Sequence, residues 1–163
     1  MGICPQELRH YVIRPTLQHL AEWSQAAENL LLGTAVQESE GGFHLKQKRC
    51  RGVGIYQITP NQHRAVWDQF LAHQPDLASC VRGLASQQEF LLHPDAELAT
   101  NLAYATAIAW NIYKFEEAIL PDSEDVKGLA RCWYHHFHQR PTGSCRDFEK
   151  HYLEMTKNKE LAA

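Results

Sequence analysis

The segment from residue 95 to residue 120 constrains the fold of this chain more than any other part of the sequence. Apolar residues recur in it at intervals of three or four, and residues 98–113 contain no charged side chain. This spacing places the apolar residues on one face of an α-helix. The residues on that face are Leu98, Leu102, Ala105, Ala109, Ile112, Phe115 and Ile119. We therefore predict a core helix over 95–120, closed by Pro121.

A membrane-spanning helix is the alternative for the same segment. Polar residues interrupt its apolar run, which is already shorter than the roughly 20 residues that a bilayer requires. These polar residues are Thr100, Asn101, Thr106 and Asn111. A buried helix fits this pattern better, and no integral membrane segment is expected.

Length, composition and charge bound the class of protein. Of the 163 residues, 44% are apolar and 21% are charged, which excludes long disorder and repetitive arrays. A chain of this length buries roughly 70% of its unfolded surface. We expect a single domain over residues 1–163, with a frayed tail at 156–163. Because 16 basic and 19 acidic residues give a net charge of −3, there is no broad positive field, and no nucleic-acid partner is expected.

Proline, glycine and capping residues divide the rest of the chain into further helices. Pro15 removes a backbone donor and should bend or split the first of them. Ser24 is placed to cap a helix that ends before Gly41 and Gly42. Pro60 can open another helix at its first turn. The predicted helices are 6–22, 24–38, one from Pro60 that turns Ala65, Val66, Phe70 and Leu71 inward, 76–92, 123–137 and 144–155.

Residues 43–58 lack helical periodicity. Within them, residues 52–58 (GVGIYQI) combine glycine with β-branched and aromatic residues, which favours a short hairpin. This hairpin is the only β element that we predict. The expected fold class is therefore mainly α, with one small β-hairpin.

Glu38 is the most informative acidic residue, because it ends an apolar helix. At 100° per residue, Ala27, Leu31 and Glu38 fall within about 20° of one line along that helix. A carboxyl at the edge of an apolar face is desolvated, which raises its pKa and prepares it to donate a proton near neutral pH. The alternative is a helix-terminal glutamate satisfied by a nearby arginine or by backbone donors.

Four segments share their order with a known family. They are Glu38-Ser39, residues 54–60 (GIYQITP), residues 101–105 (NLAYA) and Trp133-Tyr134. Together they resemble the motifs of the lysozyme-like superfamily that includes the lytic transglycosylases. Residues 12–17 (VIRPTL) and 31–39 (LLGTAVQES) are more closely similar to lysozyme-like proteins of tailed phages and prophages. The resemblance covers residues 6–155, and it implies a lysozyme-like domain with the hairpin beside a sugar-binding cleft.

The resemblance assigns a role to each matching position. Glu38 matches the single catalytic acid/base, and Ser39 the small polar residue beside it. Gln57 matches a glutamine that lines the cleft, and Tyr134 a tyrosine near the carboxylate. Where the family usually has Ala-Tyr-Asn, this chain has Trp133-Tyr134-His135, and its loop between residues 38 and 54 is basic rather than glycine-rich.

The same residue types suit a glycan substrate. An amide such as Gln57 can donate to a sugar carbonyl and accept from a hydroxyl at once, and Tyr56 and Trp133 offer flat apolar surfaces to ring faces. Core packing is the alternative for Tyr56. The predicted substrate-binding residues are Ser39, Tyr56, Gln57, Tyr104, Trp133, Tyr134 and His135.

The reaction depends on whether Glu38 has an acidic partner. Glycoside hydrolysis normally uses two carboxylates, and the candidates are more simply solvated or capping residues. These candidates are Glu40, Asp68, Glu89 and Asp95. We therefore favour a lytic transglycosylase, in which one glutamate acts as acid and then as base while a hydroxyl of the substrate attacks. A hydrolytic muramidase and a non-catalytic phage structural or cell-wall-binding protein are the alternatives.

Histidine and cysteine side chains gather in residues 132–145. Cys132 and His136 lie four residues apart on one predicted helix face, so a zinc site with Cys145 is one interpretation. The spacing matches no recognised structural site, and we favour surface or cleft histidines. The five cysteines form no CxxC pair and are expected to be reduced. No metal or cofactor is expected.

One basic run occurs in the loop that should border the cleft. A solvated loop is the favoured interpretation, and attraction of an acidic partner, such as the peptide carboxylates of a cell wall, is the other. The run consists of His44, Lys46, Lys48, Arg49 and Arg51.

Residues 1–6 (MGICPQ) show no basic leader followed by an apolar core. We expect a chain that is cytoplasmic as made. The alternatives for its later location are that it stays in the cytoplasm, that it rides in a phage particle, or that it reaches the periplasm or cell wall by a route other than general secretion. The expected partners are peptidoglycan glycan strands, with phage-particle or secretion-system components as carriers.

Overall fold

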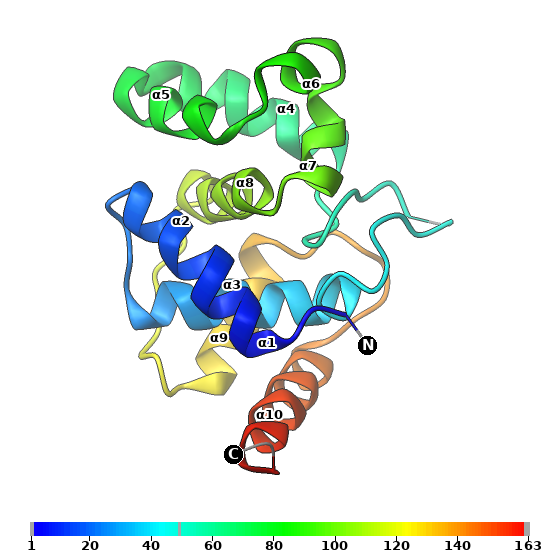
Figure 1. Cartoon of the computed structure of the whole chain (residues 1–163). Coiled ribbons are helices and arrows are strands. Elements are labelled where there is room, and N and C mark those ends of the chain that lie inside the picture. Colours follow the sequence, from blue (N-terminus) through cyan, green and yellow to red (C-terminus); the bar gives the residue numbers. More distant parts are fainter. Residues whose placement is uncertain (1, 49, 162–163) are drawn as a thin grey trace.

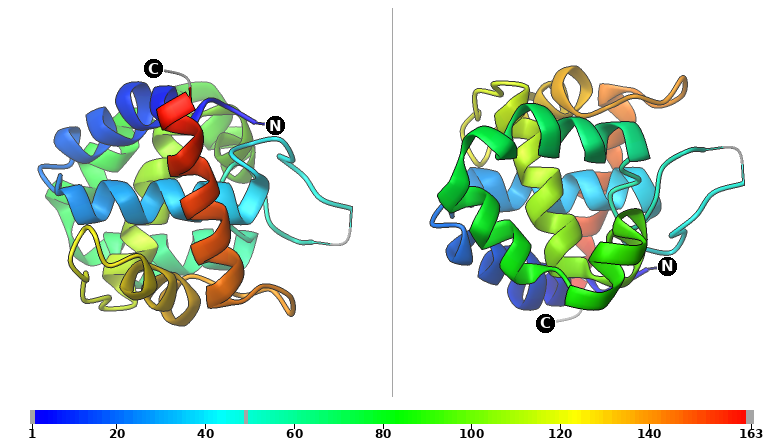
Figure 2. Two further views of the ribbon diagram at one scale, coloured as in Figure 1. Left: turned by 90° about the horizontal axis from the view of Figure 1, so that it is seen from below. Right: turned by 90° about the horizontal axis from the view of Figure 1, so that it is seen from above.

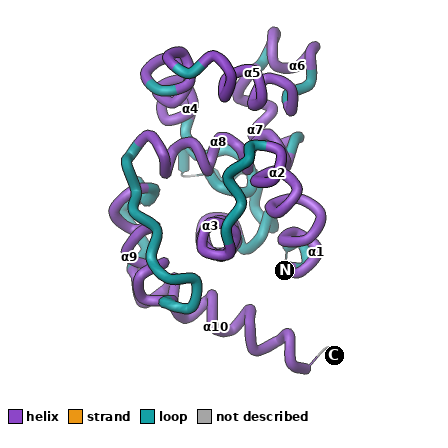
Figure 3. The backbone as a smooth tube through the Cα atoms, turned by 90° about the vertical axis from the view of Figure 1, so that its left-hand side faces the viewer, coloured by secondary structure: helices purple, strands orange, loops and turns teal. Residues whose placement is uncertain are grey.

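A 15-residue helix, α3 (Gln25–Ser39), runs through the middle of the structure (Figure 1). The computed structural model describes residues 2–48 and 50–161. The helices that surround α3 are α1 (Pro5–Leu8), α2 (Arg14–His19), α8 (Leu102–Phe115), α9 (Val126–His136) and α10 (Cys145–Leu161). Figure 3 looks along α3 and shows α1 and α2 on one side, α9 on the other, α8 above and α10 below. The predicted mainly helical fold is confirmed.

The residues of α3 explain its central position. Eleven of the 15 are buried. Its start is fixed as predicted by Ser24, whose Oγ accepts a hydrogen bond of 3.1 Å from the N–H three residues on. Gly33 lets α10 cross closely, because a Cβ atom there would collide with the ring of Phe148. The helix ends where Glu40 adopts a left-handed conformation with φ 54°.

A second layer of short helices covers the far face of α8 (Figures 1 and 2). Its elements are α4 (Pro60–Gln69), the 3₁₀ turn η2 (Leu71–His73), α5 (Pro75–Leu84), α6 (Gln87–Leu92), the 3₁₀ turn η3 (Pro94–Ala96) and α7 (Glu97–Thr100). α8 is enclosed between this layer and α3, so residues 104–113 are all buried.

Two predictions fall in this second layer. The helix that opens at Pro60 is confirmed, with Val66 and Leu71 buried and its other two inward residues partly buried. The helix predicted over 76–92 is wrong as one element. It divides into α5 and α6 because Ala85 is extended and Ser86 caps a new helix, accepting from the Glu89 N–H at 3.2 Å.

The single core helix predicted over 95–120 is also wrong at both ends. Asn101 interrupts it, because its Oδ1 caps α8 by accepting from the Tyr104 N–H at 3.0 Å. α8 then ends at Phe115, before Pro121 is reached. Of the predicted inward residues, Ile119 lies beyond this end and is 88% exposed.

The N-terminal helical segment continues past Pro15 instead of breaking there. Between α1 and α2 lies a π-helical turn, η1 (Arg9–Ile13). Proline lacks an N–H and its ring crowds the carbonyl four residues earlier, which here belongs to Tyr11 inside this turn. A π-helical turn is wider than an α-helical one, so the irregularity is absorbed before the proline.

The predicted hairpin is reduced to one antiparallel bridge in the part of the chain that the structure describes. Val53 and Ile58 exchange hydrogen bonds of 2.9 and 3.1 Å. Between them, Gly54 has φ 78°, and a Cβ atom there would collide with the backbone carbonyl of Leu98. The bridge closes a tight turn. This turn packs so closely against α7 that only glycine fits at position 54.

The C-terminal helices differ from prediction only in their bounds. α9 is capped by Asp125, which accepts from the Gly128 N–H at 2.9 Å, rather than by Ser123. α10 continues past Met155 to Leu161, so most of the tail expected to fray is helical. Within the described residues, no helix has both the length and the apolar character that a bilayer crossing needs.

A buried carboxylate joins the N-terminal helices to α3. Glu28 is 0% exposed and accepts hydrogen bonds of 2.8 Å from both Arg9 and Arg14, and of 2.7 Å from the indole of Trp23. Burial would raise the pKa of Glu28, but these hydrogen bonds and charges outweigh it and lower the pKa to about 2. The carboxylate is therefore ionised throughout the normal pH range.

We predict that Glu28→Gln lowers the free energy of unfolding by about 3 kcal/mol at pH 7, because a lowered folded-state pKa stabilises the fold above the unfolded pKa. This stabilisation is lost as the pH falls from the ordinary pKa of a glutamate toward 2. The free energies of unfolding of the variant and the wild type should therefore converge as the pH approaches 2. Urea unfolding at pH 7 and pH 3 checks both statements. The control is Glu154→Gln, since Glu154 is exposed and pairs with Lys150 only at 4.0 Å.

Candidate functional site

Glu38 lies in the last turn of α3 and is 4% exposed. Its Oε1 accepts a hydrogen bond of 2.9 Å from the indole N–H of Trp133 in α9. Its Oε2 pairs at 2.6 Å with the guanidinium of Arg140, in the irregular segment that follows α9. Three separate parts of the chain therefore meet at this carboxylate.

The electrostatic state of Glu38 follows from these contacts. Burial raises its pKa, and the charge of Arg140 and the hydrogen bond from Trp133 only partly offset that effect. The sequence offered a desolvated acid and an arginine-satisfied glutamate as alternatives. The structure combines the two, because the buried carboxyl also has an arginine partner.

Arg140 is a residue of the site that the sequence did not reveal. Besides Glu38 Oε2, its guanidinium donates to the backbone carbonyl of Glu38 at 2.7 Å and to Gln47 Oε1 at 3.2 Å. It lies 102 residues from Glu38, outside any predicted helix and outside the four family-like segments. No periodicity or motif relates two positions so far apart, so only the fold brings them together.

Ser39 and Gln57 hold the loop after α3 in place rather than line an open surface. Ser39 Oγ donates to the carbonyl of Ile55 at 2.5 Å. Gln57 has a left-handed backbone with φ 49°, and its Nε2 donates to the carbonyls of Gly54 at 2.8 Å and His44 at 3.0 Å. Its amide nitrogen is thus occupied, its Oε1 is buried without a hydrogen-bond partner, and the side chain is only 6% exposed, so in this structure Gln57 does not line an open surface for a sugar.

Tyr56 and Tyr104 lie in the core, and both are 0% exposed. Tyr56 Oη pairs with Thr106 at 3.0 Å. Tyr104 Oη pairs with His63 Nε2 at 2.7 Å and accepts from the Trp67 indole at 2.9 Å. In this structure their rings cannot contact a sugar, so core packing, the alternative for Tyr56, holds for both.

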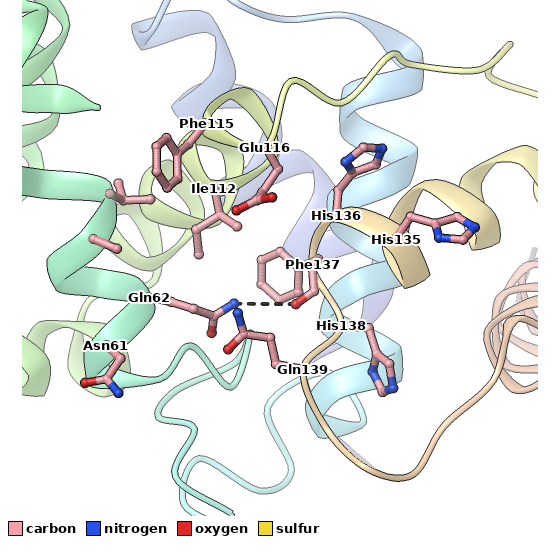
Figure 4. Close-up of a pocket in the computed structure, with 12 residues that line it drawn as sticks. Asn61, Gln62, Ile112, Phe115, Glu116, His135, His136, Phe137, His138 and Gln139 are labelled. Atoms are coloured by element: carbon pink, nitrogen blue, oxygen red, sulfur yellow. Dashed lines mark hydrogen bonds between the residues drawn. The ribbon is translucent and has the colours of Figure 1, made fainter. Parts of the chain in front are cut away.

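The three predicted residues of α9 have different surroundings. Trp133 is 0% exposed, stacks on Phe148 at 5.5 Å and contacts the tilted ring of His138 at 4.6 Å, so its flat faces are covered. Tyr134 is 42% exposed and stacks on His138 at 5.2 Å. His135 lines the cavity described next, although Figure 4 shows its ring directed away from the centre.

A cavity of about 310 Å³ opens between α4, α8 and the end of α9 (Figure 4). Val66, Ile112, Phe115 and Phe137 give it apolar surface. Its polar lining residues are Asn61, Gln62, Glu116, His135, His136, His138 and Gln139. Residues 137–139 form one wall of the cavity and directly precede Arg140 in the chain. The cavity therefore adjoins the segment whose arginine binds Glu38.

The histidine and cysteine cluster of residues 132–145 and the basic run were the other candidates. No group of three or more histidine, cysteine, aspartate or glutamate side chains there could hold a metal ion. Burial raises the pKa of Cys132 to about 11, which leaves it a thiol. The loop with the basic run protrudes from the helical body, with Lys46 bonded to the carbonyls of Arg51 and Gly52 at 3.4 Å (Figure 2). Arg49 lies outside the described residues.

Comparisons with known proteins add no assignment. No family model, no curated protein and no solved structure matches this chain.

We predict that Tyr104→Phe lowers the free energy of unfolding by about 1–3 kcal/mol, because the Trp67 indole and His63 lose a buried partner. Urea unfolding provides the measurement, with Tyr11→Phe at a 73% exposed position as the control. Unchanged stability of Tyr104→Phe would contradict a structural role for this hydroxyl group.

Proposed function

We propose that this protein cleaves the glycan strand of peptidoglycan and that Glu38 is its acid/base. The observation that carries the proposal is the state of this carboxyl: it ends the central helix, it is 4% exposed, and burial raises its pKa. A general acid needs a pKa near the working pH, which an ordinary solvated glutamate lacks. The lysozyme-like order of motifs in the sequence supports the same role.

The proposed reaction is that of a lytic transglycosylase with one carboxyl group. Glu38 gives its proton to the glycosidic oxygen as the bond to the anomeric carbon breaks. The resulting carboxylate then accepts the proton of a substrate hydroxyl that attacks the same carbon, which returns Glu38 to its acid form and yields an anhydro-sugar. Water is not consumed.

The positions of the other acidic residues support a single-acid mechanism. Asp95 is held at 2.8 Å from His63 on the far side of α8. The other three candidates, Glu40, Asp68 and Glu89, are exposed. Within the described residues, the charged group paired with the Glu38 carboxyl is the cation Arg140 and not a second carboxyl group. A hydrolytic muramidase, the related alternative, requires a second carboxyl group within about 10 Å of the first.

The cavity beside residues 137–139 is the proposed place for a sugar ring. Amide and imidazole groups of its lining can pair with hydroxyl and acetamido groups, and Phe115, a partly exposed apolar side chain of the lining, can contact a ring face. Tyr134, which is 42% exposed and stacks on the lining residue His138, is the predicted aromatic residue with free surface for a neighbouring sugar. A phage particle or a delivery route other than general secretion remains our proposal for how the protein reaches the wall.

A non-catalytic phage structural or wall-binding protein is the second candidate. Two observations favour it: both oxygens of Glu38 are occupied, and His135 stands where the lysozyme-like family usually has asparagine. Such a protein would bind wall sugars and leave them intact.

We predict that purified peptidoglycan incubated with the wild type releases anhydro-muropeptides, and that Glu38→Gln lowers the rate about 100-fold or more, because the proton donor is lost. Mass spectrometry of the soluble products, near pH 6 with a chelator present, provides the measurement. Glu40→Gln is the matched control, since its exposed carboxyl lies two residues away.

Products with ordinary reducing ends would identify a hydrolytic muramidase and reject the single-acid reaction. No products from a folded wild type that still sediments with peptidoglycan would favour the non-catalytic candidate.

A further inference from the structure

The carboxylate that should act as acid is closed off in this structure. An acid catalyst must approach the oxygen that it protonates to about 3 Å. Both oxygens of Glu38 are already engaged, one by the Trp133 indole and the other by Arg140. Trp133 is part of the core, whereas Arg140 is 22% exposed and belongs to an irregular segment. Access to Glu38 therefore requires that Arg140 move.

The segment that carries Arg140 is attached firmly at its two ends. At one end His138 stacks on Tyr134 and lies against Trp133. At the other end Ser144 Oγ donates to Asp147 at 2.7 Å. Between these ends, Gly143 has φ 115°, a conformation that suits glycine and that allows the backbone to change direction.

The closed arrangement also leaves polar atoms unpaired. Arg140 Nε and His138 Nδ1 are buried without a hydrogen-bond partner. Buried polar groups in this state cost free energy that opening to water or to a ligand would recover. Closure is therefore stabilised by the guanidinium contacts to Glu38 and its neighbours, and opposed by two unpaired atoms in the same segment.

The cavity lies against this same segment. Its wall is formed by Phe137, His138 and Gln139, the three residues before Arg140. We propose that residues 138–143 form a closure over Glu38, that Arg140 is its latch, and that a sugar ring entering the adjoining cavity releases the latch. This inference rests on the proposed glycan-cleaving function, and it makes exposure of the acid depend on the substrate.

Release of the latch also changes the acid itself. Arg140 is the group whose positive charge opposes the effect of burial on Glu38. Once it withdraws, the carboxyl loses the charge that lowers its pKa, while the water that enters weakens the burial that raises it, so opening acts on the pKa of Glu38 in two opposing ways.

The first test measures the accessibility of Glu38 in the folded protein. Arg140→Ala and Arg140→Gln are treated with a carbodiimide and an amine, and modified carboxyl groups are located by peptide mass spectrometry. We expect labelling of Glu38 to rise about tenfold in both variants, because a charge-assisted hydrogen bond is lost. Arg131→Ala is the matched control, since Arg131 is exposed in α9 and pairs with Asp125 only at 3.8 Å.

Glu28 serves as an internal control in every sample, because it is also a buried glutamate and has its own arginine partners. If Glu28 stays protected, the rise at Glu38 reports local opening and not unfolding. Arg140→Gln keeps a donor and much of the side-chain length, so it provides a folded variant if Arg140→Ala does not fold. Unchanged protection of Glu38 in the folded variant would overturn the closure.

The second test separates the closure from the proposed reaction. We expect Arg140→Gln to release peptidoglycan products several-fold faster than the wild type, with activity still lost in the double variant that includes Glu38→Gln. A slower rate would show that Arg140 assists the reaction, which overturns its role as a latch. Increased labelling without products from any variant would support the closure and reject glycan cleavage.

The third test uses the wild type and a soluble trimer of N-acetylglucosamine. The Trp133 indole N–H resonance reports on the hydrogen bond to Glu38, and the chain has four tryptophans to resolve. On titration we expect this resonance to move toward its position in Arg140→Gln. An unmoved Trp133 resonance would reject release of the latch by a sugar, whether or not other signals report binding.

Discussion

Burial of most of α3 constrains every element around it. Each polar side chain that the helix buries must have partners, because an unpaired buried charge is very costly. α3 carries two buried carboxylates, Glu28 in its first turn and Glu38 in its last. Each is met by one indole N–H and by guanidinium groups from other parts of the chain. The charges on the central helix therefore decide where the N-terminal helices, α9 and the segment after α9 attach.

The two carboxylates reach opposite states with the same kinds of partners. Glu28 has two arginines, which together overcome burial and lower its pKa to about 2. Glu38 has one and is surrounded by more protein, so burial prevails and its pKa is raised. The number of guanidinium groups and the amount of surrounding protein together separate a permanent anion that fixes the fold from an acid that can hold a proton. One helix supplies both, which gives the proposed catalytic group a rigid support.

Features that depend on local chemistry could be predicted from the sequence. Ser24 and the spacing of apolar residues predicted α3. Glu38 was expected on the apolar face at its C-terminal end, because the helical repeat fixes the direction of a side chain. The break at Asn101 was missed, because a capping side chain outweighed an apolar periodicity that continues through it. Motif resemblance located Tyr56 and Tyr104 but not their surroundings, since whether a tyrosine faces a cleft or the core depends on tertiary packing. The Arg140 contact could not be predicted, because an irregular segment has no periodicity to orient it.

The close crossing of α10 over α3 links the site to the end of the chain. Phe148 occupies the space left by Gly33 and stacks on Trp133, the residue whose indole binds Glu38. α10 follows both α3 and α9 in the sequence, so during synthesis the segments that carry Glu38 and Trp133 leave the ribosome before α10 does. The indole that binds Glu38 therefore acquires its stacking partner Phe148 only once α10 has been made and has docked, and the surroundings of the carboxyl depend on a helix that is synthesised later.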